Sequence, residues 1–105
     1  MSVQDTIKQQ VEGHPVVLYM KGSPQMPQCG FSATATQLLR QAGVNELFTI
    51  DVLQNPEIRE GIKQYANWPT IPQLYVNGEF VGGCDIIKEM FQSGELQALV
   101  STAKK

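Results

Sequence analysis

The sequence predicts an α/β fold, in which a mixed sheet of four strands is covered by helices on both faces. Three observations predict it. Helical and extended patterns alternate along the chain, the run at 16–20 has the continuous apolar character of a strand buried on both faces, and Asn77-Gly78 indicates a two-residue hairpin. A strand–helix–strand crossover makes parallel neighbours and a hairpin makes an antiparallel pair, so the sheet is expected to be mixed.

The N-terminal segment is predicted to be a short amphipathic helix over 5–12, because Ile7 and Val11 lie four residues apart. Gly13 is expected to end this helix in the left-handed conformation, and Pro15 prevents its continuation. The next expected elements are the strand at 16–20, a loop rich in Gly, Ser and Pro at 22–28, and a helix at 32–42.

The middle of the chain continues the alternation. Gly43 stops the helix at 32–42, and residues 47–50 are expected to form a second short strand. Asn55-Pro56-Glu57 has the features of a helix start: an N-cap residue type, a proline at the first helical position and an acid near the positive helix end. The apolar face of the helix at 32–42 consists of Ala35, Leu38, Leu39 and Ala42.

The last third of the chain begins where Trp68-Pro69-Thr70-Ile71-Pro72 ends the preceding helix, since a residue before proline is driven to extended geometry. Asp85, which follows two glycines, is predicted to be the N-cap of another helix. The remaining expected elements are strands at 73–76 and 79–81 around Asn77-Gly78, and helices from Asp85 to residue 90 or 91 and over 95–103.

Length and composition limit the function classes. A chain of 105 residues with 42% hydrophobic residues is expected to form one domain over 1–105. The net charge of −2, with both signs mixed along the chain, argues against nucleic-acid binding. No apolar run approaches the ~20 residues needed to span a membrane. The polar N-terminus and the presence of only two cysteines favour a reducing, cytoplasmic location.

Cys29, in Cys29-Gly30-Phe31-Ser32, is the principal candidate for chemistry. It is expected at a helix N-terminus, where free backbone N–H groups and the helix dipole favour the thiolate, which is both nucleophile and metal ligand. Ser32 stands where a C-x-x-C exchanger has its second thiol and cannot close a disulfide with Cys29. The alternative is an inert buried cysteine, but a Gly- and Pro-punctuated loop before a helix argues against burial.

With these motifs in place, the chain resembles a monothiol glutaredoxin of the C-G-F-S class, of the bacterial single-domain type, which has a thioredoxin-like fold. The resemblance implies glutathione binding and a [2Fe–2S] cluster shared by two protein chains and two glutathiones. It also implies delivery or storage of such clusters, BolA-like protein partners, and a cis peptide bond before Pro72. The matching segments are Met20–Pro24, Cys29–Ser32, Asn67–Gln73 and Gly82–Asp85.

The resemblance also implies that Cys29 is the catalytic residue and the cluster ligand. It further implies which residues would hold the glycine end of glutathione. Lys21 would favour the thiolate and meet a carboxylate of the tripeptide, unless it is merely a solvated lysine. Arg59, whose planar guanidinium suits carboxylates, would hold the glycine carboxylate; otherwise it pairs with Glu57 or Glu60 on its own helix. Lys63, one turn further, is a weaker candidate for the same duty.

The remaining implied residues would hold the rest of glutathione. Thr70-Ile71-Pro72 would present the backbone of Ile71 to the cysteinyl unit, by the pairing mode in which extended peptides add to a sheet; the alternative is a simple turn. Gly83, Cys84 and Asp85 would hold the γ-glutamyl end, with Asp85 facing its amino group. A rival interpretation makes Cys84 a distant resolving cysteine for Cys29.

Two other residues are expected to have structural places only. Trp68 is predicted to pack in the core or at the rim of the site rather than to serve as a ligand platform, and His14, the one histidine, is predicted to lie on the surface.

The function predicted from this reasoning is cluster binding and transfer in iron–sulfur protein maturation and iron homeostasis. A [2Fe–2S] cluster needs four ligands, and two copies of Cys29 with two glutathione thiolates supply four, so we expect a cluster-bridged homodimer that serves acceptor or scaffold proteins. The alternative is an oxidoreductase, in which Cys29 takes glutathione from a glutathionylated protein and a second glutathione releases it. A third interpretation is a surface adaptor, in which Cys29→Ser leaves function intact.

Overall fold

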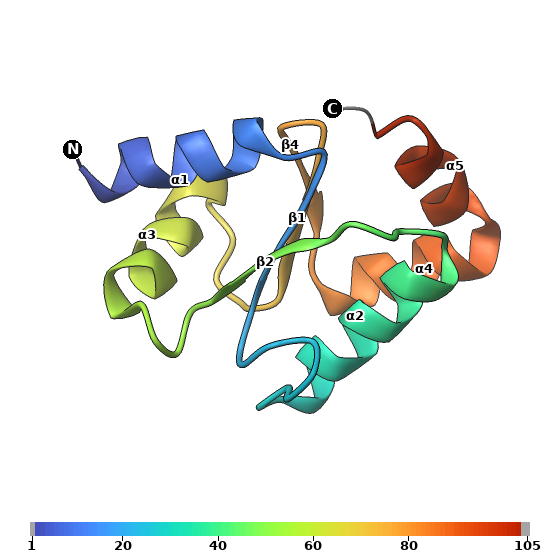
Figure 1. Ribbon diagram of the computed structural model, residues 1–105, viewed down its shortest axis with the longest axis horizontal. Helices are drawn as coiled ribbons and strands as arrows, with labels where there is room; N and C mark the ends of the chain where they lie inside the picture. The colour runs from blue at the N-terminus through green and yellow to red at the C-terminus, as the bar shows by residue number, and fades with distance from the viewer. Residues whose placement is uncertain (1, 104–105) are drawn as a thin grey trace.

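The computed structural model describes residues 2–103 and contains the predicted mixed sheet of four strands. The strand order is β2-β1-β3-β4. β1 pairs in parallel with β2 and antiparallel with β3, and β3 pairs antiparallel with β4 (Figure 1). The strands are β1 (Val16–Met20), β2 (Phe48–Asp51), β3 (Gln73–Val76) and β4 (Glu79–Gly82).

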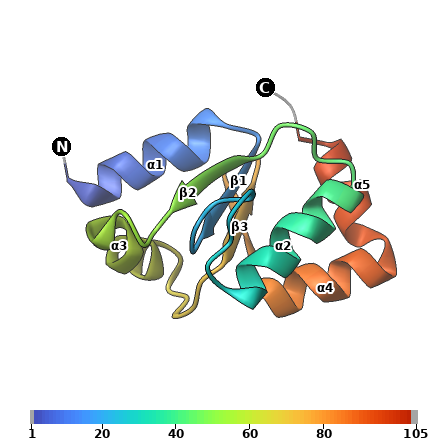
Figure 2. The ribbon, with the colours of Figure 1, turned by 60° about the horizontal axis from the view of Figure 1, so that its bottom comes forward.

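Helices cover both faces of this sheet, as predicted. Figures 1 and 2 show α1 and α3 on one face and α2, α4 and α5 on the other. None of the described helices is long and apolar enough to cross a membrane. The helices are α1 (Val3–Gly13), α2 (Gly30–Gln41), α3 (Pro56–Ala66), α4 (Cys84–Ser93) and α5 (Glu95–Ser101).

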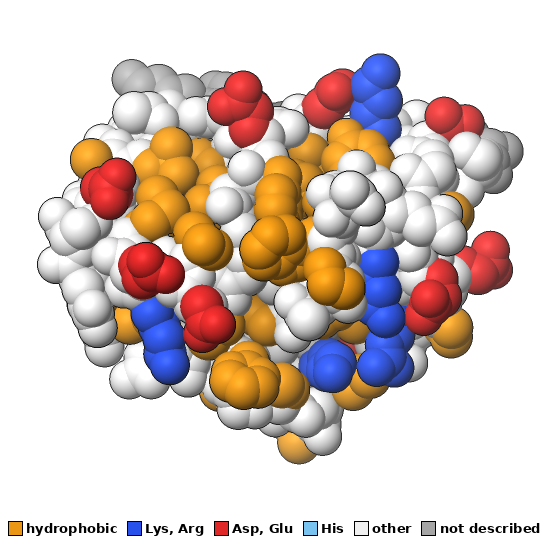
Figure 3. Space-filling view, turned by 180° about the vertical axis from the view of Figure 1, so that it is seen from behind, with side chains coloured by type: hydrophobic (Ala, Val, Ile, Leu, Met, Phe, Trp, Pro, Cys, Tyr) orange, Lys and Arg blue, Asp and Glu red, His pale blue; other side chains and the backbone are white. Residues whose placement is uncertain are grey.

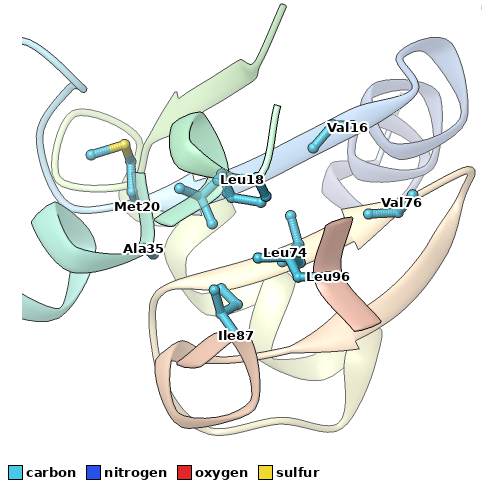
Figure 4. Close-up of a cluster of buried hydrophobic side chains, with 10 residues drawn as sticks. Val16, Leu18, Met20, Ala35, Leu74, Val76, Ile87 and Leu96 are labelled. Carbon is cyan, nitrogen blue, oxygen red and sulfur yellow. The ribbon is translucent and has the colours of Figure 1, made fainter. Parts of the chain in front are cut away.

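β1 lies in the middle of the molecule, and all five of its side chains are buried. Successive side chains of a strand point to opposite faces, so Val16, Leu18 and Met20 enter the core beneath α2, α4 and α5, while Val17 and Tyr19 enter the core beneath α1 and α3. This two-sided burial explains the continuous apolar run. Figure 4 shows the first core, in which the β1 side chains lie beside Ala35, Leu74, Val76, Ile87 and Leu96.

The end of α1 differs from the prediction. Gly13 stays helical, and the chain leaves the helix at His14, whose backbone is extended at φ −137° and ψ 145°. The left-handed ending at Gly13 is therefore wrong, because Pro15 already forces the preceding residue out of the helical conformation. His14 is half-buried rather than fully on the surface, since its ring stacks on Phe48 with 3.7 Å between ring centroids.

The start of α4 also differs. Gly83 is the N-cap, with extended backbone at φ −97° and ψ −163°, and Asp85 lies within the first helical turn. The prediction of Asp85 as N-cap is wrong, because the backbone turns into the helix directly after the glycine pair. The consequence is that the Asp85 carboxylate is not used to cap the helix and remains exposed.

Two turns follow the sequence pattern closely. Asn77 and Gly78 have φ values of 55° and 84°, as a hairpin of primed type requires. Pro56 occupies the first position of α3 and Asn55 its N-cap, as predicted, although the Asn55 side chain makes no capping bond. Its Nδ2 instead donates to the carbonyl of Asp51 at 3.0 Å and ties α3 to the end of β2.

Candidate functional site

One cleft of about 510 Å³ lies where the ends of several elements meet: the end of β1, the start of α2, α3, the segment before β3 and the start of α4. All nine residues that sequence analysis assigned to a site line this cleft, and Lys63 and Trp68 line it with them. The complete lining is Lys21, Cys29, Phe31, Arg59, Lys63, Trp68, Pro69, Thr70, Ile71, Pro72, Gly83, Cys84, Asp85 and Ile86.

Cys29 is the N-cap residue of α2, with extended backbone at φ −155° and ψ 136°, and its side chain is half-exposed. The backbone N–H of Ser32 lowers the pKa of the Cys29 thiol most strongly. Partial burial opposes this change, while the N–H of Phe31, the charge of Lys21 and the Ser32 hydroxyl lower the pKa further. The start of α2 therefore favours the thiolate of an accessible cysteine, as predicted.

Ser32 occupies the place where a second thiol would stand, and it is completely buried. Its Oγ accepts a hydrogen bond from the backbone N–H of Lys21 at 3.1 Å. The hydroxyl thus joins the first turn of α2 to the end of β1. Ser32 therefore links the two ends of the loop that carries Cys29, and it does not supply a second redox-active thiol.

The segment between β1 and α2, predicted as a plain loop, is a small hairpin closed by a bridge between Gly22 and Pro27. Ser23 and Met26 exchange two backbone hydrogen bonds of 3.3 and 3.1 Å within it. The Asp51 carboxylate anchors its base by accepting the N–H of Gly22 at 3.0 Å. This hairpin joins the end of β1 to the residue before α2 through its own hydrogen bonds.

The segment Trp68–Pro72 forms another wall of the cleft, and the Ile71–Pro72 peptide bond is cis, as the resemblance implied. Ile71 and Pro72 are buried, whereas Thr70 is exposed. The Trp68 ring packs against Phe80, with 5.4 Å between centroids, and also lines the cleft. The predicted packing of Trp68 at the rim of the site is therefore observed.

Charges of opposite sign come from different elements of the cleft lining. Arg59 and Lys63 come from α3 and Lys21 from the end of β1, while Asp85 comes from α4. Figure 3 shows Lys and Arg side chains gathered beside a band of hydrophobic side chains, on the side of the molecule where α3 lies. Among the described residues, an ion pair joins Lys63 and Glu60 at 3.6 Å. Arg59 forms no ion pair with Glu57 or Glu60 within residues 2–103.

Cys84, the first residue of α4, lines the same cleft but is buried. Burial raises the pKa of the Cys84 thiol, the charges of Asp85 and Cys29 add to this rise, and Lys88 opposes it. Within residues 2–103 no group of three or more His, Cys, Asp or Glu side chains is arranged to hold a metal ion. A single protomer therefore offers one accessible thiol, that of Cys29, and no complete metal site among its described residues.

Three residues that matter for the site were not singled out from the sequence. Gln73 is a completely buried polar residue behind the segment Trp68–Pro72, and its signal was a lone amide in an otherwise apolar strand. Phe31 is 60% exposed and lines the cleft with Cys29, while Met26, in the preceding hairpin, is 69% exposed. Their exposure has no sequence signal, because it depends on how the hairpin and α2 meet.

Comparisons with known proteins bear on this site. A sequence model of the Glutaredoxin family matches residues 16–81. Glutaredoxin 4 of Escherichia coli strain K12 is 55% identical over 102 residues, which cover 96% of this chain and 88% of that protein. Glutaredoxin 4 of Haemophilus ducreyi is 54% identical over 106 residues, which cover 100% and 98%.

Solved structures have the same architecture. Reduced apo GrxS14 from poplar superposes with a TM-score of 0.83 at 46% identity, covering 96% of this chain and 92% of that one. A buckwheat glutaredoxin–glutathione complex gives a TM-score of 0.84 at 24% identity, covering 96% and 89%, which is a likeness of fold.

Proposed function

Because this chain belongs to the glutaredoxin family and has its thioredoxin-like fold, we propose that it binds glutathione in the cleft and carries a [2Fe–2S] cluster on Cys29. One observation supports the carrier role above others. The cleft contains a single accessible thiol, and the position that would hold a resolving thiol is the buried hydroxyl of Ser32. Without a thiol at position 32, Cys29 cannot form a disulfide within its own motif, so its sulfur stays available as a ligand.

The charge pattern of the cleft suits the groups of glutathione. The peptide has a glycine carboxylate at one end and a γ-glutamyl ammonium and carboxylate at the other. Arg59 would hold the glycine carboxylate, with Lys21 or Lys63 beside it, and Asp85 would face the ammonium group across the cleft. The backbone N–H groups at Gly83 and Cys84 would receive the γ-glutamyl carboxylate at the start of α4.

The cysteinyl unit of glutathione would then lie between these ends, along the backbone of Ile71, which places its sulfur on the side of Cys29. The volume of about 510 Å³ lies within the range of ~300–1,000 Å³ of small-molecule sites. Two sulfurs, one from the protein and one from the peptide, would then be available at one edge of the cleft.

The cluster is cargo under this proposal, and the donor set explains how it would be held. A [2Fe–2S] cluster takes four ligands, usually thiolates, and one protomer with one glutathione supplies two. Two protomers with two glutathiones supply four, so the proposal includes a homodimer that forms around the cluster. Ligands that dissociate make such a cluster transferable.

The proposal extends to the setting of this transfer. Recipients or donors would be BolA-like proteins and iron–sulfur acceptor or scaffold proteins, in cluster maturation and iron homeostasis. The two unpaired cysteines suit a reducing compartment, and we place the activity in the cytoplasm on that basis.

Anaerobic reconstitution with iron, sulfide and glutathione tests the proposal. We expect the visible absorption bands of a [2Fe–2S] centre and a native mass of two chains, one cluster and two glutathiones. The same reconstitution without glutathione is the control and should leave the protein colourless. A colourless monomer in both samples would contradict the carrier role.

A second candidate, a glutathione-dependent oxidoreductase, is favoured by the lowered pKa of Cys29. The Cys29 thiolate would attack the glutathione sulfur of a protein–glutathione disulfide, form a mixed disulfide with glutathione and release the protein thiolate. A second glutathione thiolate would attack that mixed disulfide, releasing oxidised glutathione and restoring Cys29. Rapid turnover of a glutathionylated substrate, together with failure to retain a cluster, would favour this candidate.

A further inference from the structure

We propose that Gln73 is a positioning residue, whose buried amide holds the segment Trp68–Pro72 in the shape that receives the ligand. The inference rests on the proposed binding of glutathione in the cleft. Gln73 itself does not line the cleft; it lies behind the wall that this segment forms.

The amide of Gln73 uses all of its hydrogen-bonding groups to make this connection. Its Nε2 donates to the carbonyl of Trp68 at 3.0 Å and to the carbonyl of Thr70 at 3.2 Å. Its Oε1 accepts the hydroxyl proton of Tyr75 at 3.0 Å. Gln73 and Tyr75 both lie in β3 and are almost fully buried, so the rigid sheet supports the segment through one side chain.

The segment has little other support from its own backbone. Pro69 and Pro72 have no N–H group to donate. In the described part of the chain, no backbone–backbone hydrogen bond involves residues 69–72, and the last one before them runs from the N–H of Trp68 to the carbonyl of Lys63. The two bonds from Gln73 are therefore the hydrogen bonds that tie this wall to β3, beside the packing of the Trp68 ring on Phe80 and of Ile71 in the core.

This arrangement leaves the cleft side of the segment available. The N–H and C=O of Ile71 have no hydrogen-bond partner within residues 2–103, and Ile71 lines the cleft. An extended peptide pairs with such groups only when their direction is fixed, since ordering a loose segment on binding costs affinity. Gln73 would set this direction in advance, from the face of the segment that the ligand does not touch.

Replacing Gln73→Met tests the inference, because methionine keeps the length and bulk of the side chain and removes every hydrogen bond. We expect the dissociation constant for glutathione, measured by calorimetry, to rise about tenfold, as the loss of one to two hydrogen bonds implies. Gln10→Met is the matched control. Gln10 also accepts a tyrosine hydroxyl, that of Tyr19 at 2.8 Å, but it lies on α1 and does not line the cleft.

A second measurement, by NMR, reports the position of the segment Trp68–Pro72 directly. Trp68 is the only tryptophan of the chain, so its indole N–H gives one resonance in a nitrogen-correlated NMR spectrum. We expect this resonance to move in ligand-free Gln73→Met and to stay in place in Gln10→Met. In a chain that remains folded, a general loss of stability would not shift the indole resonance of Trp68 while the other resonances stay in place.

The outcomes separate the inference from the proposed function. If the unaltered chain does not bind glutathione, the proposed function fails. If it binds, and folded Gln73→Met binds equally well, only the positioning role is overturned. Should Gln73→Met not fold, the unaltered chain decides: the Nε2 protons of Gln73 should exchange with solvent more slowly when glutathione is bound, and an unchanged exchange rate would overturn the role.

Discussion

The cleft contains the starts of two helices, and each carries a cysteine, yet the two thiols differ. Cys29 at α2 is half-exposed and its pKa is lowered, whereas Cys84 at α4 is buried and its pKa is raised. Cys29 precedes its helix as the N-cap, so its sulfur lies over the free N–H groups of Phe31 and Ser32. Cys84 is already inside the first turn, where burial outweighs the helix start.

The difference shows that a helix N-terminus does not activate a cysteine by itself. One residue of displacement along the helix, together with burial, decides the sign of the pKa change. The two helix starts therefore divide the work of the proposed site: α2 offers a sulfur, while α4 offers the backbone of Gly83 and Cys84 and the carboxylate of Asp85.

The largest expected effect comes from exchanging the two sulfurs for oxygen in turn. Cys29→Ser should abolish retention of the reconstituted cluster, because it removes the one accessible thiol of the cleft. Cys84→Ser should retain a cluster, since its buried sulfur is not a ligand under the proposal. Visible absorbance and bound iron per chain measure both. Equal loss of iron in the two variants would contradict the division between α2 and α4.

The next effect concerns the charged walls that hold the ends of the ligand. Arg59→Ala and Asp85→Ala should each weaken glutathione binding roughly fivefold, as expected for charge pairs made by a half-exposed arginine and an exposed aspartate. They lie on different walls, so the double variant should lose roughly twenty-fivefold by near-additivity. Glu89→Ala, an exposed site on α4 that does not line the cleft, is the control. Unchanged affinity in the double variant, measured by calorimetry, would refute the proposed orientation of glutathione.

Much of this site was predictable, because Cys29 has a local signal at a helix start and the other site residues followed from the resemblance to monothiol glutaredoxins. The hairpin at Asn77-Gly78, the strand at 16–20 and the helix start at Asn55-Pro56 each have a strong local signal, and these elements bring the nine predicted residues to one cleft. Local pattern failed at Asp85, where a good N-cap residue stands two positions after the glycine that takes the cap.

Contacts between segments distant in the sequence were the other part that sequence reasoning did not reach. Asp51 anchors Gly22 across 29 residues, and the Ser32 hydroxyl accepts the N–H of Lys21 across 11. Neither partner has a feature that names the other. Such hydrogen bonds are fixed only when the sheet brings the ends of β1 and β2 together with the start of α2.

A smaller effect is expected from the glycines beside the two cysteines. A Cβ at Gly83 would lie 3.2 Å from Trp68 Nε1 and 3.3 Å from the carbonyl oxygen of Pro72, so Gly83→Ala should crowd the α4 wall. We expect glutathione affinity to fall a few-fold. Gly30→Ala is the matched control at α2, because its Cβ would meet nothing within 4 Å. Equal affinities in the two variants would show that the start of α4 is not a close contact of the ligand.

A smaller effect again sharpens the comparison of the two pKa values. In a Cys84→Ser background the alkylation rate of Cys29 should reach its half-maximum at a lower pH than that of a free cysteine, because its thiolate persists as pH falls. In a Cys29→Ser background the half-maximum for Cys84 should lie at a higher pH, since burial favours its neutral thiol. The reverse order of the two midpoints would contradict the account given above of both helix starts.

Ser32→Ala then tests the hydroxyl that stands in place of a second thiol. Its loss removes one of the groups that lower the pKa of Cys29, so the alkylation midpoint should move upward slightly while the N–H groups of Phe31 and Ser32 keep it below that of a free cysteine. It also leaves the N–H of Lys21 without its acceptor, at about 1 kcal/mol of unfolding free energy. Ser93→Ala, an exposed serine outside the cleft, is the control. A midpoint that does not move would leave Ser32 as a purely structural link between α2 and β1.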